Sequence, residues 1–128
     1  MLRDTFFTKA EPEEAKSDTS LELPIDLFRS GDKLIARAPI AGANLNHISV
    51  SVGPQRLTIH KAEHIVAHTD SPDRIYLEEC HWGELSRAID LPLPVNPDTT
   101  RATLTDGVLT IAMPLINPNQ SKLIRIKE

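Results

Sequence analysis

Aromatic residues are scarce in this chain, and cysteine is scarcer still. Only 4% of the 128 residues are aromatic, so a stacking platform for single-stranded nucleic acid is not expected. Cys80 is the only cysteine, which excludes an internal disulfide and fits a reducing compartment. No apolar run approaches the length of a membrane span, and the N-terminus has no apolar signal-peptide core. We therefore expect a cytoplasmic protein without stable membrane insertion.

The charge and the motif content also exclude several classes of function. The formal net charge is -4, which disfavours binding to nucleic acid or to an anionic membrane. Ser, His and Asp are present, but no nucleophile motif, phosphate-binding loop or paired-cysteine metal site surrounds them. We therefore expect no enzymatic activity, no cofactor and no metal. The composition, 40% hydrophobic and 25% charged, is that of one ordinary globular domain.

The clearest structural signal is an Asp-Gly pair between two alternating runs near the end of the chain. Asp106-Gly107 suits a two-residue hairpin turn, because tight primed turns need positive φ at both central positions. This turn pairs residues 102–105 with residues 108–111 and sorts their side chains by face. Ala102, Leu104, Leu109 and Ile111 fall on one face, and Thr103, Thr105, Val108 and Thr110 fall on the other.

Alternation of apolar and polar residues continues through most of the preceding chain. Turn residues bound each short run, and this spacing is typical of an antiparallel sandwich. Pro24 places the first strand at an edge or at its own start. We therefore expect an all-β, immunoglobulin-like sandwich, with strands over residues 21–27, 34–40, 48–52, 57–59, 75–82 and 85–91 before the hairpin.

Both ends of the chain and one internal segment lack this pattern. Residues 1–20 are mostly polar after an apolar tip, so we expect a short flexible N-terminal arm. The segment Ala62–Asp73 is long for a loop in a compact domain, which is typical of functional or disordered loops. Residues 21–114 form the expected domain, and residues 115–128 form a C-terminal extension that ends in a short β-branched run.

Several segments together resemble the α-crystallin domain of small heat-shock proteins. Ala102 followed by Asp106-Gly107-Val108-Leu109 is similar to the signature near the end of that domain. Gly83–Pro92 resembles the family's strand with a glycine, an arginine and Leu-Pro, and Pro24–Phe28 resembles its first strand. Ile124-Arg125-Ile126 matches the family's C-terminal I-x-I motif.

The resemblance implies an ATP-independent chaperone, or holdase, that binds unfolding client proteins and assembles into oligomers of dimers. It implies that a segment between residues 62 and 76 pairs with a neighbouring subunit, through Ile65, Val66, Ile75 and Tyr76. It also implies a C-terminal tail, Ile124 and Ile126, that docks on another dimer. We expect the receiving groove to be lined by Ile48, Val50, Val52, Leu85, Ile89 and Leu91. The apolar residues expected to contact clients are Leu2, Phe6 and Phe7.

Three positions depart from the family pattern. Ile40-Ala41-Gly42 stands where Leu-Pro-Gly is usual, and Leu85 stands where an aromatic residue is usual. Cys80 follows Glu79 where an arginine is common, so the interface ion pair built on that arginine is not carried over. The alternative function is a co-chaperone or scaffold of the CS-domain type, which docks one folded partner. The I-x-I tail favours the first function, because self-assembly needs it and a monomeric docking module does not.

A few further residues have two interpretations each. His60, His64 and His68 are spaced four apart and could form a metal-binding or pH-sensing stripe on a helix, but the strand and loop context favours solvated histidines. Cys80 is either a redox handle between subunits or an inert, half-buried strand cysteine. Trp82 is interpreted as core or interface packing. Arg87 falls on the apolar face of its strand without an explanation from the sequence.

Overall fold

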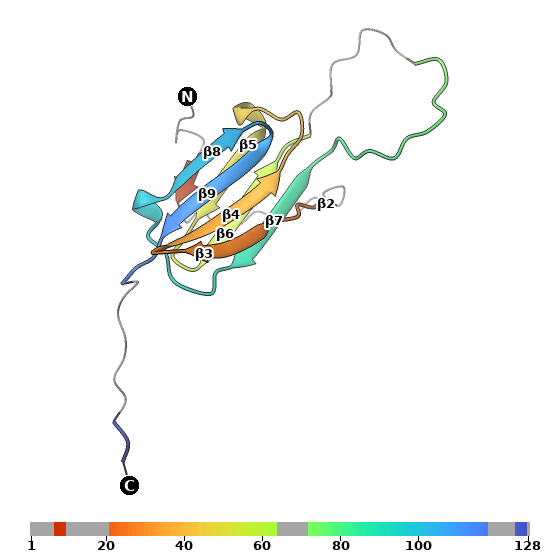
Figure 1. Ribbon diagram of the computed structural model, residues 1–128. Coiled ribbons are helices and arrows are strands. Elements are labelled where there is room, and N and C mark those ends of the chain that lie inside the picture. Colours follow the sequence, from red (N-terminus) through yellow and green to blue (C-terminus); the bar gives the residue numbers. More distant parts are fainter. Residues whose placement is uncertain (1–6, 10–20, 64–71, 118–124, 128) are drawn as a thin grey trace.

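The computed structural model describes residues 7–9, 21–63, 72–117 and 125–127 of the chain (Figure 1). Over these residues the fold consists of two β-sheets connected by turns and short 3-10 helices. The all-β sandwich predicted from the alternating runs is confirmed. Within the described ranges, no helix has the length and apolar character needed to cross a membrane.

The four-stranded sheet, called sheet B, is antiparallel throughout and contains the hairpin. Its order is β3-β4-β9-β8, so β4 and β9 are central and β3 and β8 are the edges. Its strands are β3 (Asp26–Ser30), β4 (Lys33–Pro39), β8 (Arg101–Thr105) and β9 (Val108–Pro114).

The hairpin forms as the sequence predicts. Asp106 and Gly107 join β8 to β9 with φ angles of 53° and 78°, which are the positive values that a tight primed turn requires. The observed register is the predicted one in all four pairs, Thr105 with Val108, Leu104 with Leu109, Thr103 with Thr110 and Ala102 with Ile111.

The five-stranded sheet, called sheet A, has the strand order β1-β5-β6-β7-β2. Its three inner strands are antiparallel, whereas β1 joins β5 and β2 joins β7 in parallel. The two N-terminal strands therefore lie at opposite edges of the same sheet. The bounds are β1 (Phe7–Lys9), β2 (Leu21–Glu22), β5 (Ile48–Val52), β6 (Arg56–Lys61) and β7 (Leu85–Asp90).

The run predicted as one strand over residues 21–27 is two strands in different sheets. β2 belongs to sheet A and β3 to sheet B, and residues 23–25 pass between them. Pro24 has no N–H to donate to a ladder, so the strand breaks at that residue. Leu23 is fully buried at the crossing, and its N–H donates to the carbonyl of Ser86 at 3.0 Å.

Arg87 has a structural role at this crossing. The register places it opposite Ile59 on the inward face of β7. Its Nη1 donates to the backbone carbonyl of Leu23 at 3.1 Å. The arginine therefore holds the sheet-crossing segment against β7, which explains a charged residue in the apolar phase of that strand.

Two short 3-10 helices, Leu45–His47 and Pro97–Thr99, connect strands. Each begins after an asparagine, Asn44 or Asn96, whose side-chain oxygen accepts from the N–H two residues further on at 2.9 Å. Such caps satisfy backbone donors that a short helix leaves unpaired.

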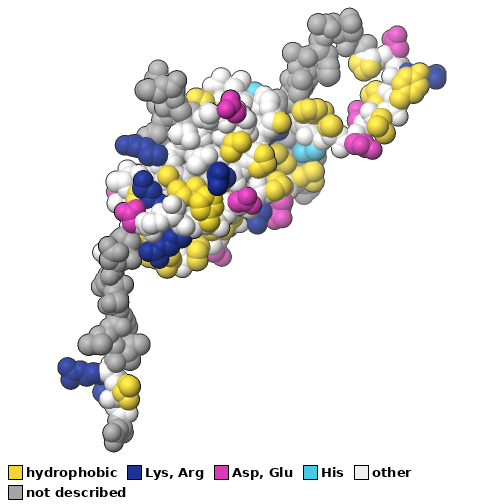
Figure 2. All heavy atoms as spheres, in the orientation of Figure 1, with side chains coloured by type: hydrophobic (Ala, Val, Ile, Leu, Met, Phe, Trp, Pro, Cys, Tyr) yellow, Lys and Arg dark blue, Asp and Glu magenta, His cyan; other side chains and the backbone are white. Residues whose placement is uncertain are grey.

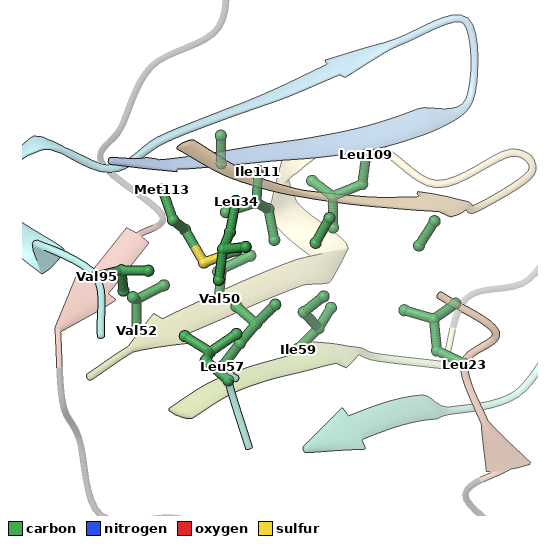
Figure 3. Close-up of a cluster of buried hydrophobic side chains, with 14 of the residues drawn as sticks. Leu23, Leu34, Val50, Val52, Leu57, Ile59, Val95, Leu109, Ile111 and Met113 are labelled. Carbon is green, nitrogen blue, oxygen red and sulfur yellow. The ribbon is translucent and has the colours of Figure 1, made fainter. Parts of the chain in front are cut away.

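The core fills the space between the two sheets (Figure 3). Alternate residues of the central strands point into this space, because successive side chains in a strand face opposite sides. The buried residues include Val50, Val52, Leu57 and Ile59 from sheet A and Leu34, Leu109, Ile111 and Met113 from sheet B.

Backbone pairing continues past the end of β9. Leu115 is buried and forms a β-bridge with Val95, and its N–H donates to the carbonyl of Asp32 at 2.8 Å. The N–H of Ile116 then donates to the carbonyl of Pro94 at 3.1 Å. Packed structure therefore extends to Ile116.

The strand predicted over residues 75–82 is not formed. Residues 72–84 contain no strand in the part of the chain that the structure describes, and β7 begins at Leu85. A strand requires a neighbour to complete its backbone hydrogen bonds, and no described strand pairs with residues 75–82.

Candidate functional site

The β6–β7 loop, residues 62–84, carries large apolar side chains in its described part. Ile75, Tyr76, Leu77 and Trp82 are 56%, 86%, 76% and 46% exposed. The described part of the loop extends away from the sandwich and comes back to it at Gly83 and Glu84 (Figure 1). Figure 2 shows apolar side chains of this segment interspersed with acidic ones. Large apolar side chains gathered on one exposed segment mark an interaction surface.

Lys61, the last residue of β6, contacts the end of the loop that leads into β7. Lys61 Nζ donates to the carbonyl of Gly83 at 2.7 Å and to that of Trp82 at 3.5 Å. Lys61 is only 2% exposed, because it lies in the inward phase of β6, opposite Leu85 of β7. Burial lowers the pKa of the Lys61 ammonium, and the charge of Glu63 acts in the opposite direction.

Two histidines contact the same end of the loop, at Glu84. His60 Nε2 donates to Glu84 Oε2 at 2.8 Å, and His81 Nε2 donates to the backbone oxygen of Glu84 at 2.9 Å. Gly83 leaves room for this arrangement, since a Cβ there would lie 2.9 Å from His81 Cε1. We call these four polar residues the root cluster: His60, Lys61, His81 and Glu84.

Sequence reasoning missed Lys61, although one signal could have found it. Leu57, Ile59 and Lys61 occupy the same inward phase of β6, so a lysine interrupts an apolar alternation. A charge in that phase is buried only when polar partners receive it. The partners, two carbonyls more than twenty residues further along the chain, are not visible in the sequence.

Sheet B presents an exposed edge at β3. No described strand pairs with the outer side of its five residues. Phe28 on this strand is 38% exposed, and Arg37 Cζ of β4 lies 4.9 Å from its ring centroid. An unprotected edge of this length is a template for pairing with another chain.

The structure does not place side by side the two strands that were predicted to line the groove for the C-terminal tail. β5 and β7 do not adjoin, because β6 lies between them in sheet A. Their inward side chains face the other sheet, so the space that the tail was to enter belongs to the core. Ile48, Val50, Val52 and Leu91 are buried, and Leu85 and Ile89 are partly buried.

The remaining predicted positions divide between exposed residues and residues outside the described ranges. Ile126 is 93% exposed, and Phe7 contributes its backbone to β1. Cys80 is exposed and lies outside any described strand, so the half-buried strand cysteine is wrong. Trp82 is not a core residue of this chain. Leu2, Phe6, His64, Ile65, Val66, His68 and Ile124 lie outside the described residues.

Of the three histidines weighed as a stripe and interpreted as solvated, only His60 is described, and it contacts Glu84 from the outward face of β6. Its strand setting removes the helical spacing on which the stripe depended. Among the described residues, no three His, Cys, Asp or Glu side chains are grouped so as to hold a metal ion.

Two facing sheets, the Asp-Gly hairpin and a long loop between β6 and β7 define a β-sandwich of the α-crystallin type. The model of the Hsp20/alpha crystallin family matches residues 28–127, and the chain belongs to this family. The family consists of small heat shock proteins, which are non-enzymatic chaperones. The resemblance found in the sequence is thereby confirmed.

Curated relatives agree with this assignment. Spore protein SP21 of Stigmatella aurantiaca is 32% identical over 92 residues, which are 72% of this chain and 54% of the relative. The match therefore spans about half the length of that protein. Small heat shock protein C2 of Rickettsia felis is 22% identical over 126 residues, 97% of this chain and 81% of the relative.

Solved structures show the same fold. Heat shock protein 16.0 from Schizosaccharomyces pombe superposes with a TM-score of 0.67 and 25% identity, covering 84% of this chain and all of that one. A small heat-shock protein from Xylella fastidiosa, 19% identical, has a TM-score of 0.63 over 83% of this chain and 96% of its own.

Proposed function

We propose that this protein is an ATP-independent holdase, which captures unfolding proteins on exposed apolar surface and prevents their aggregation. Family membership supports the chaperone role. Capture is a binding step, so it requires no nucleotide. We place this activity in the cytoplasm, since a single exposed cysteine suits a reducing compartment.

The observation that carries the proposal is the apolar part of the β6–β7 loop. A single chain leaves Ile75, Tyr76 and Leu77 more than half exposed to water. Burial of one such side chain stabilises a complex by about 1.5–3 kcal/mol before ordering costs. A second polypeptide that covers this segment is therefore strongly favoured, and in the resting protein that polypeptide is a second copy of the chain.

In the proposed dimer, the loop adds a strand to the β3 edge of the second copy. Ile75 and Leu77 point to one side in an extended strand and Tyr76 to the other, so both faces of the added strand carry apolar groups. Glu78 and Glu79 follow this run, and β3 carries Asp26 as well as Arg29, so apolar contact and backbone pairing rather than charge support this arrangement. Strand addition would also provide backbone hydrogen bonds for residues 75–77, which pair with no described strand in one chain.

The C-terminal tail joins these dimers into larger oligomers. Ile124 and Ile126 are two apart, so in an extended tail both side chains point the same way. We propose that the tail pairs with the edge of β5, because the inward faces of β5 and β7 are already filled by the core. That edge is the one to which β1 is joined, so the tail and β1 compete for it.

The decisive experiment is light scattering of a thermally aggregating client enzyme, with and without the protein, and with ATP removed enzymatically. We expect scattering to fall with increasing protein and to be independent of ATP. An unchanged curve at equimolar or higher subunit ratio would contradict the proposal, as would a strict requirement for ATP. A monomer that binds one folded partner would instead support the scaffold alternative.

A further inference from the structure

We propose that Lys61 is a positioning residue for assembly. By holding the carbonyls of Trp82 and Gly83, it fixes the direction in which the β6–β7 loop leaves the sandwich and thereby slows the separation of two subunits. This role rests on the proposed exchange of that loop between copies.

The placement of the Lys61 ammonium strengthens its hydrogen bonds to the end of the loop. Its stem lies in the inward phase of β6, and the residue is 2% exposed. A desolvated ammonium without partners is costly, so the two carbonyl oxygens it contacts are held where they can accept. The shorter contact, 2.7 Å to Gly83, has the length of a charge-assisted hydrogen bond.

The rest of the root cluster restricts the next residue along the chain, Glu84. His60 and His81 both donate to Glu84, one to its carboxylate and one to its backbone carbonyl. Lys61 and His60 are neighbours on β6, and their side chains point to opposite faces of sheet A. The end of the loop that leads into β7 is therefore held by contacts on both faces. Glu63, just past β6, is the other charge that acts on Lys61.

A fixed root matters because the apolar part of the loop lies only a few residues away. Ile75, Tyr76 and Leu77 make no strand in one chain and must become ordered against a partner. A segment whose base is already ordered loses less conformational freedom when it binds. Loss of the Lys61 hydrogen bonds therefore shortens the life of the dimer without removing any side chain of the contact itself.

The test uses Lys61→Met in the full chain, because methionine keeps an unbranched apolar stem and removes the donors and the charge. Lys33→Met, at the exposed start of β4, is the matched control for the loss of one positive charge. Subunit exchange between differently labelled samples measures the lifetime of the dimer. Amide hydrogen exchange over residues 82–86 measures the root directly and does not depend on assembly.

For Lys61→Met we expect subunit exchange that is about tenfold faster or more, as loss of one charge-assisted hydrogen bond implies. Faster amide exchange over residues 82–86 should accompany it, with no fall in thermal midpoint, and Lys33→Met should match the parent protein. Gly83→Ala displaces His81 and should also speed subunit exchange while leaving Lys61 in place.

Unchanged amide exchange over residues 82–86 in Lys61→Met would overturn the claim that Lys61 holds this end of the loop in place. A looser root with unchanged subunit exchange would overturn its role in assembly while leaving the dimer intact. A parent chain that is monomeric at every concentration would overturn the proposed dimer itself, and the positioning role with it.

Discussion

Lys61 connects a cost in folding with a gain in assembly at a single residue. Its ammonium is desolvated in an inward position of β6, which is unfavourable for the folded chain. The same burial places Nζ within reach of two backbone carbonyls, those of Trp82 and Gly83. A residue that is poor for stability can therefore be retained for the position of a loop.

The lowered pKa of Lys61 predicts a specific dependence of stability on pH. Between its folded-state pKa and the ordinary lysine value of 10.5, the unfolded chain holds a proton that the folded chain has released. The free energy of unfolding should therefore rise with pH in that interval. The stabilisation is lost as the pH falls through the folded-state pKa.

Lys61→Met removes this dependence. Urea unfolding of both proteins at a series of alkaline pH values up to 10.5 gives the comparison. The parent protein should gain stability relative to the variant as the pH rises, whereas the other titrating groups cancel in the difference. A constant difference across the series would contradict the prediction.

Gly107 carries a second prediction at the residue scale. Its φ of +78° is unfavourable for a residue with a Cβ, although a Cβ there would lie 3.7 Å from the Ile40 oxygen, an ordinary contact. Gly107→Ala should therefore cost about 1–2 kcal/mol through conformation alone. Thr105→Ala, exposed in the same hairpin, should change the unfolding free energy by less than about 0.5 kcal/mol. Equal losses in chemical denaturation would contradict this account.

At the scale of elements, the sequence predicts best where a strand has its partner nearby in the chain. The β8–β9 hairpin was predictable to the residue, because one turn fixes the register and the pleat then sorts the side chains. The buried faces of β4, β5 and β6 follow from alternation for the same reason. The shared family signature made the sandwich predictable as well.

The misses are all elements whose neighbours lie far away or outside the chain. β1 has no pattern of its own and exists through its contact with β5. The division between β2 and β3 at Pro24 depends on two different sheets receiving the two halves. Residues 75–82 have strand propensity, but none of the described strands pairs with them. The residues predicted to line the groove show a related limit, since alternation identifies an inward face without showing what fills it.

The β6–β7 loop provides the first prediction for an element. Replacement of Ala62–Ile75 by a short Gly-Ser turn should give monomers, because it removes Ile75 and leaves the loop too short to carry Tyr76 and Leu77 to a second copy. Sedimentation at low protein concentration measures the result, and circular dichroism should show that the sandwich is retained. Dimers that persist would show that the segment is only a loop.

β1 provides the second prediction for an element. Its three residues occupy the edge of β5 at which we place the C-terminal tail. Deletion of residues 1–9 should expose that edge and increase binding of the tail. Binding of a fluorescent peptide of residues 119–128 to the chain without its own tail is the measurement. Phe7→Pro with Lys9→Pro should act like the deletion, since proline cannot donate to the ladder. Unchanged affinity would mean that the tail uses another surface.

At the scale of the whole molecule, the proposed contacts differ in strength. Burial of both isoleucines of the tail gains about 3–6 kcal/mol gross, and ordering the extension consumes part of this gain. One tail therefore binds weakly, while several tails that close a shell hold firmly through effective concentration. The span from Ile116 to Ile124 is at most about 29 Å, enough to reach a neighbouring domain. Such an assembly should hold together and still exchange subunits.

Ile124→Ala combined with Ile126→Ala tests this organisation. The double variant should elute as dimers on size exclusion, with the β-sheet circular dichroism of the parent protein. Arg125→Ala is the matched control, because in an extended tail its side chain points away from the two isoleucines. An elution volume that does not move would show that the tail is not the connector.

Trp82, the only tryptophan in the chain, lies at the root of the β6–β7 loop and is 46% exposed. The protein therefore contains its own optical probe at the point where the loop leaves the sandwich. Its fluorescence emission should move to shorter wavelength when a second copy covers the loop and return to longer wavelength when that copy leaves. Association and dissociation of the dimer can thus be followed in the unlabelled protein through the emission of one indole.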